Sequence, residues 1–354
     1  MLTNVHEITM HEYLNLLEFT IKNKRNLLIL GSAGSGKTEA AQALTERLKM
    51  KCVYLNLSVL EAPDLVGLPM LTKESRVDYA LPIFFPLESS EPTVLLIDEA
   101  DKAKPELQNP LLELLQFRSI NGRKLNIESC ILTGNLPDEG AHSGLISTAL
   151  TNRCMVFKLE TDFETWQEWA VNAGVNSLVV AFLSRHPNLL KPTGKLEDPT
   201  EYCRPSPRAW TLAGFDLDAA PDMSLDMKTN IVAGRVGSSS AVKFRVWLDH
   251  YQVIEPKIKA LIEKGVMPDI QSESIDRIFI YGIAAASAIR KFTVKDKVQK
   301  AAKHAFQFLE ILPPEIQIGA VRTAFDIRYI EKFGLTSIPE VMKVYSKINA
   351  SLKG

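Results

Sequence analysis

A glycine-rich turn near the N-terminus sets the strongest limit on the architecture of this chain. Residues 31–38 satisfy the pattern G-x-x-x-x-G-K-[ST], and they stand between a short apolar run at 26–30 and a helical pattern. The pattern is specific because it needs three parts in order, which are a strand, a turn of small residues and a helix. We therefore expect a P-loop within an α/β domain.

Short apolar runs alternate with helix-length segments along the first half of the chain. The runs are Asn26–Leu30, Cys52–Leu57, Thr93–Ile97, Ser129–Thr133 and Cys154–Leu159. Continuous apolar runs with this spacing indicate a parallel sheet that is buried on both faces. The expected fold class is α/β, with a five-stranded parallel sheet in a P-loop core.

Two segments between these runs are longer than a plain connection needs. The first, between the second and third runs, holds about 35 residues and indicates an insertion. The second, Arg118–Leu125, centres on Asn121-Gly122, which is the strongest short-range signal for a β-hairpin. We expect this hairpin to stand out from the sheet.

Helical periodicity replaces the strand pattern after Leu159. We expect a nucleotide-binding core over 1–160, a helical lid over 161–250 and an additional α-helical domain over 251–354. In the last of these, helices are expected near 274–291, 296–311, 315–333 and 338–352.

The composition favours a cytosolic protein. Residues 1–7 lack a basic segment followed by an apolar stretch, and no run approaches the roughly 18 apolar residues that a membrane span needs. The net charge of -1 gives no one-sided basic field for non-specific binding of nucleic acid, although a local basic patch stays open. The cysteines have no spacing typical of zinc sites and are expected to be buried or reduced thiols; they are Cys52, Cys130, Cys154 and Cys203.

The glycine-rich turn carries the chemistry of phosphate binding. Its glycines let the backbone turn tightly, so that amide N–H groups and the positive end of the following helix hold a polyphosphate. Lys37 then reaches the β- and γ-phosphates, and Thr38 offers a hydroxyl to the Mg²⁺ that bridges them. The expected cofactors are ATP and Mg²⁺, and the residues expected at the nucleotide are Gly31, Ser32, Ala33, Gly34, Ser35, Gly36, Lys37, Thr38 and Glu39.

Carboxylates end the third apolar run. Asp98 and Glu99 follow residues 93–97 directly, and parallel strands end on the side of the sheet where α/β proteins bind their ligands. We expect Asp98 to be a metal ligand together with Thr38. Glu99 is expected to orient and deprotonate the attacking water.

Two further polar residues lie near these run ends. Asn135 follows the fourth run, where it can hold the water or the γ-phosphate without adding charge, although Gly-Asn after a strand is more often only a turn. Asp101 has no separate role that the pattern assigns, and we expect a surface or helix-capping acid.

These elements resemble the nucleotide site of AAA+ ATPases, over residues 1–250. The resemblance extends to the MoxR-type branch through Asp64–Gly67, Leu95–Ala100, Leu111–Gln116 and the hairpin that follows. Members of that branch have an insertion in helix 2 and a hairpin before the asparagine strand, which match the two inserts expected here.

The resemblance implies two functional arginines. Arg153 stands before the fifth strand, at the position of the arginine that reaches the γ-phosphate of the neighbouring subunit. The family more often has an acid before and an aromatic after it, whereas this chain has Asn152 and Cys154. Arg208 follows the capping residue Ser206 and resembles the lid arginine that contacts the γ-phosphate of its own subunit. The expected catalytic set is Lys37, Asp98, Glu99, Asn135, Arg153 and Arg208.

The resemblance also implies a biochemical function. Such proteins form homo-oligomeric rings, commonly hexamers, and use Mg-dependent ATP hydrolysis to remodel or activate a protein partner as MoxR-like chaperones. The partner commonly contains a von Willebrand factor A domain, which the C-terminal helices are expected to dock; no membrane partner is implied. Leu68, Met70 and Leu81–Phe85 are candidate contact surfaces, although such apolar residues more often pack in a core.

Two alternatives stay open at this point. A nucleic-acid-dependent motor or loader would use Arg118, Arg123, Lys124 and the stretch 291–303 for phosphate contacts, but the near-neutral charge and the lack of an aromatic-rich surface count against it. A nucleotide-gated scaffold with little turnover would not need Glu99, Asn135 and two arginines.

Overall fold

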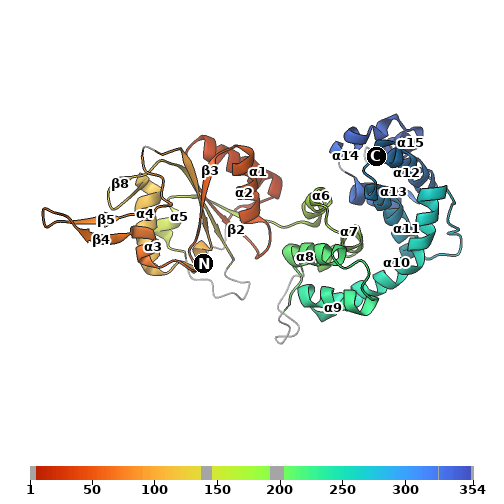
Figure 1. The fold of residues 1–354 in the computed structure, drawn as a ribbon, viewed down its shortest axis with the longest axis horizontal. Coiled ribbons are helices and arrows are strands. Elements are labelled where there is room, and N and C mark those ends of the chain that lie inside the picture. Colours follow the sequence, from red (N-terminus) through yellow and green to blue (C-terminus); the bar gives the residue numbers. More distant parts are fainter. Residues whose placement is uncertain (1–4, 89, 137–145, 192–202, 326, 352–354) are drawn as a thin grey trace. The chain divides into compact units, whose positions relative to one another are not determined.

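The computed structural model describes residues 5–88, 90–136, 146–191, 203–325 and 327–351, and the chain divides after Asp162 into two units. The first unit contains all the strands found in the described residues, and the second is helical (Figure 1). No helix in these ranges combines the length and the apolar character that crossing a membrane requires.

The first unit is built on a parallel sheet with the strand order β1-β10-β2-β9-β6-β3. Its strands are β1 Glu7–Ile8, β2 Asn26–Leu30, β3 Lys51–Asn56, β6 Thr93–Asp98, β9 Ile127–Gly134 and β10 Met155–Leu159. The five predicted strands and their parallel direction are confirmed. The prediction missed a sixth strand, β1, which pairs with β10 and is only two residues long.

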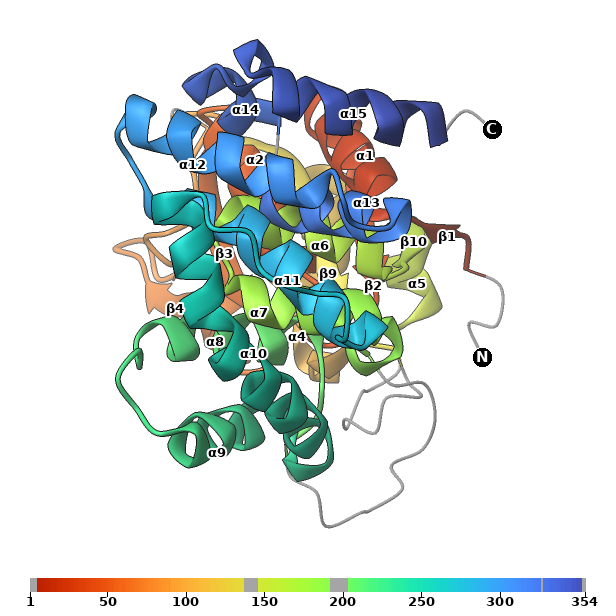
Figure 2. The same ribbon diagram turned by 90° about the vertical axis from the view of Figure 1, so that its right-hand side faces the viewer.

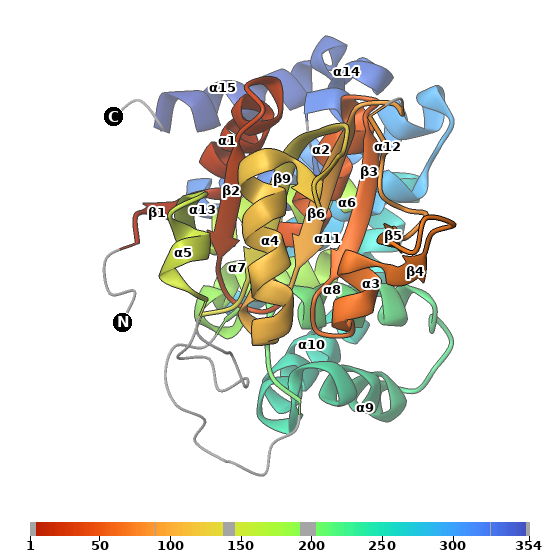
Figure 3. The same ribbon diagram turned by 90° about the vertical axis from the view of Figure 1, so that its left-hand side faces the viewer.

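Helices cover both faces of this sheet, which explains why the strands read as continuous apolar runs. On one face, α1 (Met10–Lys22) and α2 (Lys37–Arg47) pack with Leu27 and Ile29. On the other face, α3 (Ala62–Val66), α4 (Pro105–Phe117) and α5 (Thr148–Thr151) pack with Leu28 and Leu30, and Figure 3 shows α4 in front of the strands. Alternate residues of β2 therefore enter two different cores.

Both predicted inserts are present. The first contains an antiparallel hairpin of β4 (Leu68–Leu71) and β5 (Val77–Ala80), which extends away from the sheet of its unit in Figure 1. The second is the predicted hairpin, formed by β7 (Ser119–Ile120) and β8 (Arg123–Lys124). The Glu113 carboxylate of α4 holds its turn by accepting hydrogen bonds from Ser119 Oγ and from the backbone N–H groups of Asn121 and Gly122.

The second unit consists of helices. They are α6 Phe163–Ala173, α7 Ser177–Arg185, α8 Pro207–Asp218, α9 Leu225–Val236, α10 Ser238–Lys264, α11 Ile275–Ala288, α12 Lys295–Leu309, α13 Pro314–Ala324, α14 Ile327–Phe333 and α15 Pro339–Ser351. Figure 2 shows α11 among α7, α10, α12 and α13, with which it packs. The helix predicted over 315–333 is wrong as a single element, because Phe325 leaves the helical conformation (φ -133°, ψ 139°) and inserts its ring into the core between α13 and α14.

One hydrophobic cluster runs through the whole second unit. Within it, the Phe182 ring contacts the rings of Trp210, Phe244 and Trp247. Helix α10 is continuous across residues 250 and 251, where the lid was expected to end. The division of this unit into a lid and a C-terminal domain stays a prediction.

Candidate nucleotide-binding site

The glycine-rich turn joins β2 to α2 at the carboxyl end of the sheet, which is the end where the parallel strands finish. Gly34 and Gly36 adopt φ values of 73° and 87°, a backbone region that side chains with a Cβ rarely enter. Gly31 is needed for another reason, because a Cβ there would lie 3.2 Å from the carbonyl oxygen of Leu159. Backbone conformation thus favours glycine at positions 34 and 36, and a close approach favours it at position 31.

The Lys37 side chain is buried inside this turn, with 6% of its surface exposed. Its Nζ donates to the carbonyl oxygens of Gly31 (2.9 Å) and Ser32 (2.8 Å) and to Ser35 Oγ (3.4 Å). A buried ammonium is costly unless oxygen atoms surround it, and the turn supplies them. Phosphate oxygens of a nucleotide are acceptors of the same kind.

Tyr13 of α1 fixes the start of α2 from behind. Its hydroxyl donates to the Lys37 carbonyl oxygen at 2.9 Å, and the side chain is fully buried. Burial, with Asp98 and Glu39 nearby, raises the pKa of Tyr13, so the hydroxyl stays protonated. The sequence analysis saw Tyr13 only as an apolar residue of a helix.

Asp98 ends β6 within a set of neutral donors. Its Oδ2 accepts from the Tyr54 hydroxyl at 2.9 Å, and its Oδ1 accepts from the Glu99 N–H at 2.9 Å and from Thr133 Oγ1. Burial, together with the hydrogen bond to Asp98, raises the pKa of Tyr54 to about 12, so Tyr54 remains a donor at neutral pH. Tyr54 and Thr133 lie on the two strands that flank β6 and were also missed.

The register of the sheet brings the turn and the carboxylates together. Strand β9 lies between β2 and β6, with Gly134 paired to Leu30 and Leu132 paired to Ile97. Since neighbouring strands lie about 4.8 Å apart, the ends of β2 and β6 are about 10 Å apart. Residues 31–38, Asp98, Glu99 and Asn135 therefore share the carboxyl end of the sheet, as the motif order predicts.

Glu99 occupies a strained position. Its φ is 55°, which is uncommon for a residue with a side chain, and its carboxylate pairs with Lys102 at 3.1 Å. Lys102 ends the short 3₁₀ helix η1 (Ala100–Lys102) that follows β6. The backbone thus turns sharply at the residue expected to act on water.

The expectation for Asp101 is wrong. Only 2% of Asp101 is exposed, and its Oδ1 accepts the backbone N–H of Asn135 at 2.9 Å. Its Oδ2 is buried and has no hydrogen-bond partner among the described residues. The acid is buried because it bridges two segments that are distant in sequence, and it fixes the position of Asn135 at the end of β9.

The two predicted arginines lie elsewhere. Arg153 precedes β10 at the opposite, amino end of the sheet, where its guanidinium donates to Gln116 Oε1 (2.7 and 3.0 Å) and to the Ala149 carbonyl oxygen (2.7 Å). Arg208 is exposed in the first turn of α8 in the second unit. There Ser206 caps the helix as predicted, because its Oγ accepts from the Ala209 N–H at 3.1 Å.

The residues present suit a bound Mg·ATP. Within the described ranges, no group of three or more His, Cys, Asp or Glu side chains forms a metal site by itself. Mg²⁺, however, is usually held by one or two carboxylates together with phosphate oxygens and water. Asp98 and the Thr38 hydroxyl at the start of α2 offer such a partial set beside the glycine-rich turn.

Residues 26–151 match the family model described as an AAA domain of the dynein-related subfamily. The matched segment begins with β2, ends with α5, and includes the glycine-rich turn, both hairpins, Asp98, Glu99 and Asn135. Residues 26–151 thus match an AAA domain, and they fold as a parallel α/β sheet around the glycine-rich turn.

The other matches are to individual proteins. A protein of Staphylococcus saprophyticus described as uncharacterized is 35% identical over 98 residues, which are 27% of this chain; the chain thus spans 37% of the length of that curated relative. Among solved structures, a mutant of RuvB from Thermotoga maritima is similar with a TM-score of 0.42 and 16% identity, over 72% of this chain and 76% of that one. NtrX from Brucella abortus in complex with ADP is similar with a TM-score of 0.34 and 14% identity, over 96% and 68% of the two chains. The match to the AAA domain, and not these likenesses, carries the assignment.

Proposed function

We propose that this chain is a Mg-dependent ATPase that forms homo-oligomeric rings. It contacts a protein partner through its hairpins and uses ATP hydrolysis to remodel or activate that partner, as MoxR-type proteins do. The observation that carries the proposal is the set of groups gathered at the carboxyl end of the sheet. The buried Lys37 ammonium lies there in the glycine-rich turn after β2, with Asn135 after the neighbouring strand β9 and Asp98 and Glu99 at the end of β6, one strand further.

The first task of this site is to bind the triphosphate. Backbone N–H groups of residues 31–38 and the N-terminus of α2 hold phosphate oxygens, and the Lys37 ammonium exchanges its carbonyl partners for the β- and γ-phosphates. Thr38 and Asp98 hold Mg²⁺, which neutralises negative charge on the phosphates when it is bound. Tyr54 and Thr133 orient Asp98 for this role.

The second task is to activate water. Glu99 accepts the proton of the attacking water, and its carboxylate exchanges its present partner, the Lys102 ammonium at 3.1 Å, for that water. Asn135 orients the water or the γ-phosphate, and Asp101 holds the backbone of Asn135 in place.

The third task is to complete the site from outside the core. Arg153 lies at the amino end of the sheet, so it serves the nucleotide of a neighbouring copy and ties hydrolysis to assembly. Arg208, in the first turn of α8, serves the γ-phosphate in its own chain, a role that the family resemblance alone suggests.

Exposed apolar residues support a protein partner. On the β4–β5 hairpin, Leu68 is 61% and Met70 is 56% exposed, and Leu71 is 75% exposed. In the segment 81–85 that follows, Ile83 is fully exposed, whereas Phe85 is buried in the core. The hairpin and Ile83 are thus the proposed contact surface, and a von Willebrand factor A domain is the class of partner that the MoxR resemblance suggests.

The nucleic-acid alternative is not favoured by the hairpin that would serve it. Arg118 donates to the backbone carbonyls of Leu115 and Lys24, Arg123 pairs with Asp78, and Lys124 donates to the Phe117 carbonyl oxygen at 3.0 Å. Asp78 neutralises Arg123, so Arg118 and Lys124 do not form with it the row of cations that a phosphate backbone needs.

The test is ATP turnover of Glu99→Gln beside a matched control, Glu106→Gln. Glu106 lies exposed in the first turn of α4 and has no role in the proposal. We expect Glu99→Gln to bind ATP and to lose about 10²–10⁴-fold in kcat, since it removes the general base, while Glu106→Gln keeps the wild-type rate. Equal rates for Glu99→Gln and wild type would remove Glu99 from the mechanism, absence of turnover in the wild type would favour the scaffold, and stimulation by DNA but not by protein would favour the motor.

A further inference from the structure

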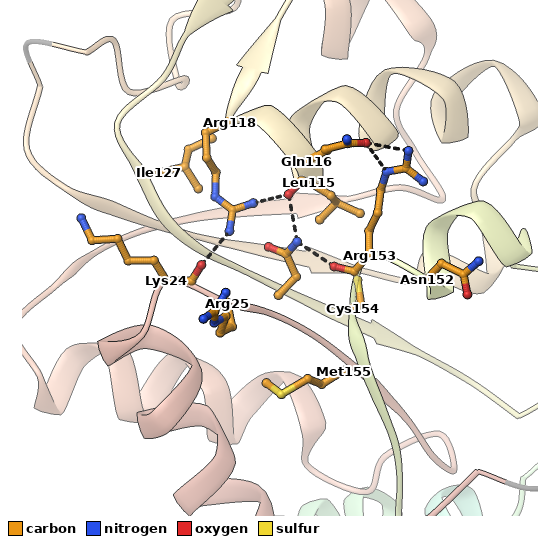
Figure 4. Close-up of a pocket in the computed structure, with 11 residues that line it drawn as sticks. Lys24, Arg25, Leu115, Gln116, Arg118, Ile127, Asn152, Arg153, Cys154 and Met155 are labelled. Carbon is orange, nitrogen blue, oxygen red and sulfur yellow. Dashed lines mark hydrogen bonds between the residues drawn. The ribbon is translucent and has the colours of Figure 1, made fainter.

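A cationic cavity lies at the amino end of the sheet of the first unit. It has a volume of about 500 Å³ and is lined by 11 residues, of which four are cationic and none is acidic. The cations are Lys24, Arg25, Arg118 and Arg153, and Figure 4 shows them around the start of β2 and β10. We call this cavity the amino-end pocket.

Two of its arginines are held in place by neutral groups. Arg118 ends α4 with φ 54° and donates to the carbonyl oxygens of Leu115 (2.7 Å) and Lys24 (3.3 Å). Arg153 donates to Gln116 Oε1 and to a backbone carbonyl oxygen. Neither guanidinium forms an ion pair within the described residues, so both positive charges remain uncompensated.

One side chain links the two arginines into a single frame. Asn26 Nδ2 donates to the Leu115 carbonyl oxygen at 2.9 Å, which is the acceptor that Arg118 also uses, and to the Arg153 carbonyl oxygen at 2.8 Å. Asn26 thus ties together the backbone at Leu115 and Arg153, while the guanidinium groups keep their own hydrogen bonds to Leu115, Lys24, Gln116 and Ala149. Groups that are ordered before a ligand arrives lower the entropic cost of binding.

The remaining lining adds no negative charge. Burial raises the pKa of the Cys154 thiol to about 12, so this residue is neutral at physiological pH. Lys24 is the exception among the cations, because Glu128 pairs with it at 3.1 Å. The positive charge of the pocket therefore comes from Arg25, Arg118 and Arg153.

This chemistry fits a phosphate chain. Guanidinium groups bind phosphate oxygens through charge-assisted and often bidentate hydrogen bonds. A volume of about 500 Å³ lies within the range of pockets that hold small molecules, which is roughly 300–1,000 Å³, and is larger than one inorganic phosphate needs.

The chain's own nucleotide cannot supply these phosphates. The pocket lies at Asn26, where β2 begins, and the glycine-rich turn follows Leu30, where β2 ends. Five strand residues at about 3.3 Å each separate the two sites by about 16 Å. The nucleotide site and the amino-end pocket thus lie at opposite ends of one sheet. This arrangement fits a head-to-tail contact, in which the pocket of one copy faces the nucleotide of the next. Such contacts generate a ring when the rotation between copies closes.

We propose that Arg118 and Arg25 act with Arg153 as one pocket that receives the triphosphate of a nucleotide bound to a second copy of this chain. This rests on the proposed ATPase function, and it adds to Arg153 two cations that stabilise the charge on the transferring phosphate.

The experiment mixes subunits that are defective at opposite ends. Arg118→Gln copies keep an intact carboxyl end, and Glu99→Gln copies keep an intact amino-end pocket. Each alone is expected to lose at least about tenfold in turnover. An equal mixture is expected to exceed the mean of the two, because an Arg118→Gln catalytic site then meets an intact pocket. The same mixing applies to Arg25→Gln.

Controls separate a folding defect from the proposed role. Arg118 also caps α4, so Arg25→Gln is the second variant, since Arg25 is exposed and its loss leaves α4 intact. Arg118→Lys is expected to recover part of the rate by restoring the charge. Arg47→Gln, an exposed arginine at the end of α2, is expected to behave as wild type.

The outcomes are distinguishable. If wild type does not hydrolyse ATP, the proposed function itself is wrong. If wild type hydrolyses ATP and both Arg25→Gln and Arg118→Gln keep its rate, or if mixing gives only the mean, the inference falls while the ATPase stands. A calorimetric titration of Lys37→Ala with tripolyphosphate tests whether the pocket binds a free anion instead of the nucleotide of a second copy. Saturable binding that Arg118→Gln abolishes, together with no recovery of turnover on mixing, would overturn the second copy as the source of the phosphates.

Discussion

Replacing Asp101 by alanine is expected to slow ATP turnover while leaving the affinity for ATP nearly unchanged. Asp101 is buried and its Oδ1 is 2.9 Å from the Asn135 backbone nitrogen, so alanine leaves this N–H without its acceptor. The glycine-rich turn and Lys37 hold the phosphates and do not depend on this bond. The loss should therefore appear in kcat and not in KM.

The magnitude follows from the hydrogen bond. Leaving a buried donor unpaired costs about 1–3 kcal/mol. The segment after β9 avoids this penalty only if it moves so that the Asn135 N–H reaches water. Each 1.4 kcal/mol, roughly, reduces the population with Asn135 in place tenfold. We expect kcat to fall about 10–100-fold in Asp101→Ala. Asp101→Asn keeps an acceptor oxygen and should lose less than about fivefold.

Steady-state ATPase kinetics and urea unfolding of the same variants provide the assay. If Asp101 acts through Asn135, the double variant Asp101→Ala, Asn135→Ala should be no slower than Asn135→Ala alone. Wild-type kcat in Asp101→Ala, or losses that multiply in the double variant, would refute the reasoning. A loss of kcat in Asp101→Asn as large as in Asp101→Ala would assign the effect to the charge and not to the hydrogen bond.

Two more predictions concern the first unit. Glu113→Ala removes a carboxylate that accepts three hydrogen bonds of 2.8–3.2 Å from the β7–β8 hairpin; we expect the free energy of unfolding in urea to fall by about 2–4 kcal/mol, against less than about 0.5 for Glu106→Ala. Burial raises the pKa of Cys154 to about 12, so its thiol is protonated at pH 8. We expect iodoacetamide to alkylate Cys154 at pH 8 at least about tenfold more slowly in the folded protein than in urea, as measured by mass spectrometry. Rapid alkylation of folded Cys154 would mean that it is exposed as a thiolate.

The strands could be predicted because their signal is local. All residues of β2 except Asn26, and all of β6 except Asp98, are buried, chiefly beneath two helical layers, so the runs contain almost no polar residue. Strand β1 could not be found in this way, since two residues show no period. It exists because β10 offers partners, with Lys158 N–H donating to the His6 carbonyl oxygen and Glu160 N–H to that of Ile8, both at 2.9 Å.

The helical half was predicted as helical but not as a packed unit. Periodicity shows which face of a helix is apolar, and does not show which helix covers it. Helix α10 illustrates the limit, because Pro256 lies inside it and would be read as a break. Instead, Phe244 and Trp247 before the proline and Leu261 after it belong to the same core cluster.

Some residues of the candidate site could be predicted from the sequence, and others could not. Lys37, Asp98 and Glu99 stand in short motifs whose spacing is fixed along the chain. Tyr13 and Tyr54 reach this site over separations of 24 residues to Lys37 and 44 residues to Asp98, and no local pattern marks them. Only the register of the sheet, with β9 between β2 and β6, brings such residues together.

The distribution of buried charged side chains also indicates a functional site at the carboxyl end of the sheet, independently of any sequence motif. Among the residues that the structure describes, Lys37 and Asp101 are the two charged side chains counted as buried, at 6% and 2% exposure. Buried charges are unfavourable for stability, and proteins keep them chiefly where function requires them. Both lie at the carboxyl end of the sheet, one inside the glycine-rich turn and the other against Asn135. A chain that needed this end only for folding would be more stable with apolar residues at both positions.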